Sequence, residues 1–132
     1  MKRIRSVLIV DAHREDREHL ARILAEHRMS VVEAESVDDA IVEIHSRTLA
    51  GAPAQFAVIF VNRYLPLGTG ADLVAEIRSR SQIAELPVVM TDDESISDKT
   101  KALVYPLGLA AFIGKPLSKS VVTASLRRAF RR

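Results

Sequence analysis

The stretch Ala57-Val58-Ile59-Phe60-Val61-Asn62-Arg63-Tyr64-Leu65-Pro66 decides how the rest of the chain folds. Residues 58–61 form an unbroken apolar run, which is typical of a strand buried on both faces of a parallel sheet. The run ends at a polar residue, Asn62, and a proline follows at Pro66. Because ligands gather at the carboxyl ends of the strands in such a sheet, we expect Asn62 to lie at its functional edge.

The composition favours one α/β domain spanning residues 1–132. The chain is 48% hydrophobic with a mean hydropathy of +0.08, enough apolar mass for a core. Aromatic residues make up only 5% and cysteine is absent, which excludes disulfides and thiolate metal sites. No signal peptide is expected from the first residues, whose apolar run is short, and no apolar stretch approaches membrane-spanning length. We therefore expect a cytoplasmic protein.

The formal net charge is +2, and much of the positive excess lies near the two ends of the chain. Such ends can bind nucleic acid or an acidic protein surface, or can place cations favourably at a helix terminus. We favour the second interpretation, because the sequence has no helix-turn-helix and no basic aromatic stripe.

Strands and helices are predicted to alternate along the chain. Strands are expected at 4–10, 29–33, 58–61, 87–90 and 109–113, and helices at 13–28, 37–47, 71–78, 95–107 and after Ser118. The first helix carries mixed charges, Arg17 among them, on its predicted solvent face. Segments 49–55 and 65–70 are expected to be loops. This alternation predicts a doubly wound parallel sheet of five strands with five helices.

Polar residues follow four of the predicted strands. They are Asp11, Asn62, Thr91 with Asp92, and Lys115. We expect them to converge on one edge of the sheet.

Four pieces of the chain, in this order and spacing, resemble the receiver domain of two-component response regulators, the CheY-like family. They are Val7-Leu8-Ile9-Val10-Asp11, Val61 to Pro66, Leu86 to Met90, and Gly108 through Phe112 to Lys115-Pro116. The resemblance covers essentially the whole chain. It implies a flavodoxin-like fold with strand order 2-1-3-4-5.

The resemblance also implies a set of site residues, of which this chain has only part. In the family, an aspartate at the Asn62 position accepts a phosphoryl group from a histidine kinase. Two acidic residues after the first strand hold Mg²⁺, and a Ser or Thr after the fourth strand and a Lys before a cis-proline contact the phosphoryl group. The residues that match are Asp11, Lys115, Pro116 and the aromatic switch position Phe112.

Three positions depart from the family pattern. Ala12 stands in place of the second acid, and Asn62 in place of the acceptor. Asp92 occupies the hydroxyl position in an ungapped alignment, and Thr91 does so only with a one-residue deletion. A carboxamide is a poor nucleophile, and Mg²⁺ prefers carboxylate ligands. We therefore expect no phosphorylation at Asn62, weak or absent Mg²⁺ binding, no metal centre and no other cofactor.

We expect the remaining polar groups to keep the site in one conformation. We expect Lys115 to neutralise Asp11 and Asp92, which would leave a permanent anion near the lysine. Asn62 is expected to bond to the loop around residues 65–68, and His13 to be a solvated first-turn residue.

These expectations favour a degenerate pseudo-receiver without enzymatic activity. It would act in bacterial two-component phosphorelay signalling as a phosphorylation-independent protein-interaction module. Its partners would bind the face made by helix 95–107, strand 109–113 and the last helix, including Lys99, Leu103, Phe112, Lys119 and Arg127; a homodimer is possible. Two alternatives stay open: an active receiver with an unusual acceptor, Asp92 or Asp93, and a basic nucleic-acid-binding module.

Overall fold

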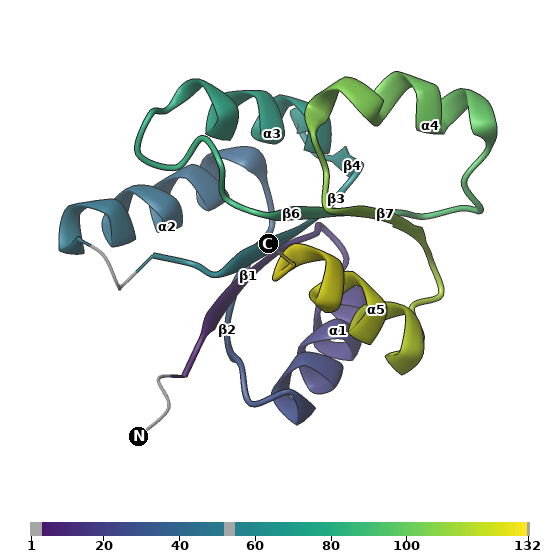
Figure 1. Ribbon diagram of the computed structural model, residues 1–132, viewed down its shortest axis with the longest axis horizontal. Helices are drawn as coiled ribbons and strands as arrows, with labels where there is room; N and C mark the ends of the chain where they lie inside the picture. The colour runs from purple at the N-terminus through teal and green to yellow at the C-terminus, as the bar shows by residue number, and fades with distance from the viewer. Residues whose placement is uncertain (1–3, 52–54, 132) are drawn as a thin grey trace.

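Five parallel strands form a central sheet between two layers of helices (Figure 1). The computed structural model describes residues 4–51 and 55–131. Across the sheet the strands follow the order β2 (Ser30–Ala34), β1 (Ser6–Val10), β3 (Val58–Asn62), β6 (Val88–Asp92) and β7 (Ala111–Gly114). Every neighbouring pair is parallel. Counted along the chain, this is the predicted order 2-1-3-4-5, so the flavodoxin-like fold is confirmed.

Helices cover both faces of the sheet (Figure 1). One face is covered by α1 (Arg14–Glu26) and α5 (Lys119–Ala129), and the other by α2 (Val37–Ala50), α3 (Gly70–Ser79) and α4 (Asp98–Val104). Successive side chains of a strand point to opposite faces, so β1 sends Leu8 and Val10 to the core beneath α2 and α3, and Val7 and Ile9 to the other core. None of the described helices is long and apolar enough to cross a membrane.

Several element boundaries differ from the sequence prediction. Helix 95–107 is shorter than predicted: α4 ends at Val104 and a 3₁₀ turn, η1 (Tyr105–Leu107), follows it, because Pro106 lacks the N–H that would continue an α-helix. Strand 87–90 extends to Asp92, so Thr91 and Asp92 lie within β6. A small antiparallel hairpin of β4 (Tyr64–Leu65) and β5 (Gly68–Thr69) overlaps the predicted loop 65–70. In segment 49–55, α2 continues to Ala50, whereas residues 52–54 lie outside the described part.

The start of α3 packs directly against the end of β3. The Gly70 N–H donates to the Arg63 carbonyl at 2.9 Å. A Cβ atom on Gly70 would lie 2.5 Å from the Asn62 carbonyl oxygen. Thr69 and Asp72 form a reciprocal capping box at this helix start. Only a glycine therefore permits α3 to begin this close to the backbone of Asn62.

We predict that Gly70→Ala lowers the free energy of unfolding by about 1–3 kcal/mol, because the added methyl group meets backbone atoms that cannot move aside cheaply. Urea denaturation followed by circular dichroism measures this change. The control is Ala75→Ser, which adds one atom on the exposed side of the same helix and should change stability by less than about 0.5 kcal/mol. Equal stability of Gly70→Ala and the parent protein would contradict the close approach.

Candidate functional site

The polar residues that follow the strands do meet at the carboxyl edge of the sheet. Asp11 follows β1, Asn62 ends β3, Thr91 lies beside Asn62 in the register of β6, and Lys115 follows β7. Asp11 is 4% exposed and Asn62 is fully buried. The predicted convergence of these residues is therefore present in the structure.

The Lys115 ammonium group is the centre of this edge. Its Nζ donates to Asp11 Oδ2 at 2.8 Å, to Asp16 Oδ2 at 2.7 Å and to Asp93 Oδ1 at 2.9 Å. The lysine side chain is only 12% exposed. The peptide bond between Lys115 and Pro116 is cis, as the family resemblance implies.

The expected pairing of Lys115 with Asp92 is wrong. Asp92 Oδ2 instead accepts from Arg63 Nη1 at 3.2 Å, and Asp92 Oδ1 accepts from the Glu94 N–H. Arg63 thus holds the Asp92 side chain at the end of β6. Asp93, just beyond the end of β6, is the one that reaches it.

Burial and charge act in opposite directions on the pKa values in this cluster. Burial alone would lower the pKa of Lys115, but hydrogen bonds to Asp11, Asp16 and Asp93 outweigh it, and the pKa lies well above its usual value. Burial raises the pKa of Asp93, but the hydrogen bond and charge of Lys115 and the hydrogen bond from Asn62 prevail, and this pKa is lowered. Both effects favour the charged forms of the pair.

Every polar atom of the Asn62 side chain has a partner. Its Oδ1 accepts from Thr91 Oγ1 at 2.9 Å, and its Nδ2 donates to Asp93 Oδ1 and to the Tyr64 carbonyl, both at 3.1 Å. These partners fix the orientation of the amide, because the opposite orientation would place Oδ1 against two acceptors. The expected bond from Asn62 to the loop therefore goes to Tyr64, just before the predicted segment. Thr91, and not Asp92, is the residue that contacts Asn62.

The loop after β1 brings three further groups together. The Asp11 Oδ1 atom accepts from the His13 backbone N–H at 2.9 Å and lies 3.1 Å from His13 Nδ1. His13 precedes α1 as its N-cap residue and its side chain is 57% exposed. Potential ligand atoms of Asp11, His13 and Asp16 lie within 4.8 Å of one another. This is a group that could hold a metal ion, and the sequence analysis missed its Asp16 member.

The family resemblance implies Mg²⁺, and the carboxylates at this edge that could bind it also contact Lys115. Mg²⁺ requires an octahedral set of oxygen ligands. The Oδ2 atoms of Asp11 and Asp16 already accept from Lys115, and Asn62 Oδ1 accepts from Thr91. Ala12, in the position of the second acid, is exposed and its side chain has no ligand atom. An ion at this position would compete with the lysine ammonium for the same oxygens.

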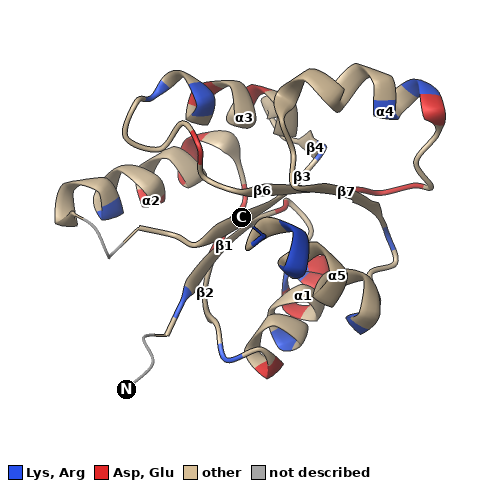
Figure 2. Cartoon of the chain, in the orientation of Figure 1, with Lys and Arg blue, Asp and Glu red and all other residues tan. Residues whose placement is uncertain are grey.

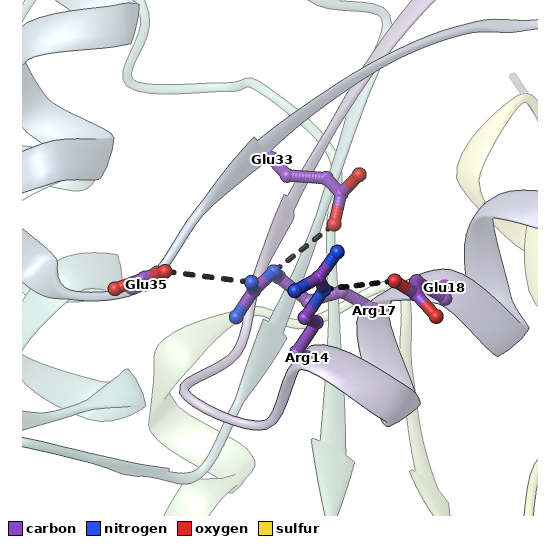
Figure 3. Close-up of a pocket in the computed structure, with 5 residues that line it drawn as sticks. All are labelled: Arg14, Arg17, Glu18, Glu33 and Glu35. Atoms are coloured by element: carbon purple, nitrogen blue, oxygen red, sulfur yellow. Dashed lines mark hydrogen bonds and ion pairs between the residues drawn. The ribbon is translucent and has the colours of Figure 1, made fainter.

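A buried arginine supports the backbone of the site. The Arg17 side chain is 9% exposed, and its Nη1 donates to the Asp11 carbonyl at 2.8 Å. Its other nitrogens pair with Glu33 and Glu35, and these residues line a small surface pocket with Arg14 and Glu18 (Figure 3). The sequence prediction that Arg17 is solvated is therefore wrong, because Glu33 of β2 and Glu35 just after this strand pair with it.

The aromatic position Phe112 is half-buried. It packs against the core beneath α2 and α3. Phe112 therefore lies on β7 as expected, next to the edge that contains Lys115.

A comparison with protein families identifies the class of this protein. Residues 7–127 match the response regulator receiver domain. The chain therefore belongs to the response regulator receiver domain family, in agreement with the fold and with the position of Lys115 and its cis-proline.

The sequence identity to individual relatives is low. The two-component response regulator ORR5 of Oryza sativa subsp. japonica is 26% identical over 125 residues, covering 95% of this chain and 88% of the relative. ORR13 of the same plant is 27% identical over 111 residues, covering 84% and 86%.

Solved structures show the same fold. Chemotaxis protein CheY4 of Vibrio cholerae has a TM-score of 0.84 at 23% identity, covering 97% of this chain and 100% of that one. A putative response regulator from Chloroflexus aurantiacus has a TM-score of 0.85 at 20% identity, with 98% and 100% covered.

The lowered pKa of Asp93 predicts an acid-dependent contribution to stability. A carboxyl group with a lowered pKa in the folded state stabilises the fold above its unfolded pKa of about 3.9, and this contribution is lost as the pH falls through the folded pKa. The free energy of unfolding of Asp93→Asn should therefore fall less steeply than that of the parent protein between about pH 5 and pH 3. Urea denaturation at a series of pH values measures both slopes.

The neighbouring Glu94→Gln is the matched control, because Glu94 is exposed and its side chain forms no ion pair within the described residues. Its slope should equal that of the parent protein. Identical slopes for Asp93→Asn and Glu94→Gln would contradict the role assigned to the contact between Asp93 and Lys115.

Proposed function

We propose that this receiver domain acts in two-component signalling as a protein-interaction module that does not require phosphorylation. The observation that carries this proposal is the full occupation of the Asn62 amide by Thr91, Asp93 and Tyr64. The position that accepts the phosphoryl group in the family is here a structural hydrogen-bonding residue.

The chemistry of the amide argues against phosphoryl transfer. A nucleophilic carboxylate carries a negative charge and lone pairs that can attack phosphorus. The carboxamide of Asn62 has no charge, and its single oxygen already accepts from the Thr91 hydroxyl. We therefore propose that the domain has no phosphoryl-transfer activity and is not an enzyme.

The contacts of Lys115 with the carboxylates of this site argue for weak Mg²⁺ binding. Lys115 holds the Oδ2 atoms of Asp11 and Asp16 at 2.8 and 2.7 Å. A divalent ion would have to displace this ammonium group, and it would find no carboxylate at Ala12. We propose that Mg²⁺ binding is weak and that no cofactor is needed.

Asp93 supplies the anion that holds the lysine. Its Oδ1 accepts from both Asn62 Nδ2 and Lys115 Nζ. In the family, the phosphoryl group is the anion that the corresponding lysine contacts. A permanent carboxylate on Lys115 is a fixed substitute for it, and it would keep the surrounding loops in one arrangement.

The surface that would bind a partner lies on α4, η1, β7 and α5. Exposed apolar side chains on these elements are Leu103 at 65%, Tyr105 at 86% and Val121 at 37%. We propose this face as the protein-binding surface, for another protein or for a second copy of the chain. Two residues that were expected on this face have other surroundings. Lys119 pairs with Glu26 of α1 at 2.8 Å, and Arg127 lines a groove at the other end of the sheet.

The alternative of an active receiver has one observation in its favour. The Asp93 carboxylate is 35% exposed and contacts Lys115 directly. It is therefore the best placed of the two alternative acceptors, whereas Asp92 is buried against Arg63. The cytoplasmic location and the absence of nucleic-acid binding stay predictions.

We predict that the protein does not gain a phosphoryl group when it is incubated with Mg²⁺ and acetyl phosphate. Intact mass spectrometry measures the outcome. A known active receiver, treated in parallel, confirms that the phosphodonor works. A stoichiometric phosphoryl adduct would refute the proposed function, and loss of that adduct in Asp93→Asn or Asp92→Asn would identify the acceptor.

We also predict that Asn62→Asp alone restores only substoichiometric phosphorylation. The new carboxylate would lie about 3 Å from Asp93 Oδ1, and two carboxylates at this distance raise the pKa of one of them. Ala12 would still lack a metal ligand. The triple change Ala12→Asp, Asn62→Asp and Asp93→Ala corrects all three defects and should give more adduct in the same assay. Full modification of the single variant would show that this explanation of the metal site is wrong.

A further inference from the structure

A groove lies at the amino-terminal end of the sheet, opposite the Lys115 cluster. Its walls are the start of β1, the turn from α1 to β2, and the last turn of α5. Basic segments lie at all three of these places (Figure 2). The residues that line the groove include Ile4, Arg5, Arg28, Met29, Leu126, Arg127 and Phe130.

The groove is positively charged. Arg5, Arg28 and Arg127 are exposed, and no residue that lines the groove is acidic. Within residues 4–51 and 55–131, none of these three arginines forms an ion pair. By contrast, Arg14, Arg17, Arg63 and Arg80 all pair with carboxylates. The groove therefore has positive charge that the fold itself does not neutralise.

Apolar side chains lie between the arginines. Met29 and Leu126 are buried at the base of the groove, and Ile4 is 68% exposed at its rim. The Arg5 guanidinium lies over the Phe130 ring, 4.3 Å from its centroid. A ligand in this groove would meet apolar surface at the centre and cations around it, which is the common arrangement of protein-binding sites with a charged rim.

We propose that this groove docks an acidic, amphipathic peptide segment of a partner protein. Glutamate or aspartate side chains of the segment would face Arg28 and Arg127, and its apolar side chains would cover Ile4, Met29 and Leu126. This surface is independent of the Lys115 cluster, so the proposal does not depend on whether the domain is phosphorylated.

Charge and the covered aromatic face favour this occupant over the undescribed segments of this chain and over single-stranded nucleic acid. The segments of this chain outside the described part, residues 1–3, 52–54 and 132, contain no acidic side chain, so they do not supply the complementary charge. Single-stranded nucleic acid binds through bases stacked on aromatic faces, and the face of Phe130 is already covered by Arg5. A second copy also carries exposed acids, Glu94 and Asp98 among them, so self-association is an outcome that the experiments below must separate from binding of a partner peptide.

Fluorescence anisotropy with labelled synthetic peptides tests the proposal. The probe is a peptide of about four helical turns with leucines at i, i+3, i+4 and i+7 and glutamates between them. It should bind saturably, and more weakly as salt is added. A peptide with lysine in place of glutamate, and one with serine in place of leucine, should bind at least about tenfold more weakly, which corresponds to about 1.4 kcal/mol.

Protein variants locate the binding site. Arg28→Asn with Arg127→Glu should weaken binding of the glutamate peptide by about tenfold or more; asparagine is chosen because Arg28 has a φ of 59°, which asparagine tolerates. The matched control is Arg128→Glu, at the next position of α5, exposed and outside the groove, which should bind like the parent protein. Circular dichroism and thermal unfolding establish that all variants are folded.

Four outcomes of the binding experiments would overturn the proposal. They are no saturable binding of the glutamate peptide, equal binding of the lysine peptide, the same loss in Arg128→Glu as in the double variant, and tighter binding of a labelled DNA strand or duplex than of the peptide in the same buffer. Sedimentation of the protein alone tests the remaining occupant: self-association that the double variant abolishes would assign the groove to a second copy of this chain and would also overturn the proposal.

Discussion

The contact of one ammonium group with three carboxylates holds the functional edge of this domain together. Lys115 follows β7, whereas Asp11 follows β1, Asp16 lies in the first turn of α1, and Asp93 follows β6. Without the lysine, the carboxylates of Asp11, Asp16 and Asp93 would repel one another. A largely buried charge without a partner also lowers the stability of the folded state. The lysine therefore allows these segments to meet, and the positions of the loops at this edge depend on it.

Asn62 completes this arrangement because an amide both donates and accepts. Asp93 and the Tyr64 carbonyl need a donor, and the Thr91 hydroxyl needs an acceptor. An ionised aspartate could serve only Thr91. Within the described residues no buried polar side-chain atom lacks a hydrogen-bond partner, which is the condition under which a buried polar network fixes one conformation. Thr91, Asp93 and Tyr64 thus form a hydrogen-bonding environment that suits an amide at position 62, where the family has an aspartate.

Much of this arrangement could be predicted from the sequence. The apolar run before Asn62 and the alternation of strands with helices give the sheet, and the switch-point rule places Asp11, Asn62 and Lys115 at one edge. The choice between Asp92 and Asp93 failed because it depends on where β6 ends, a boundary that periodicity does not define to one residue. The ion pairs of Asp16 and Arg17 were missed because they are tertiary contacts between segments far apart in the sequence. Asp16 pairs with Lys115 after β7, and Arg17 pairs with Glu33 of β2. The groove was missed because it forms from three segments far apart in the sequence.

The buried amide of Asn62 also affects how such a protein would be controlled in a cell. Kinases and phosphatases change the state of a receiver within the lifetime of each molecule. If the proposed function holds, every copy of this protein presents the same surface from the moment it folds, and occupancy of its partner follows mass action. The strength of the output would then be set by synthesis and degradation, and the time over which it changes would be the half-life of the protein.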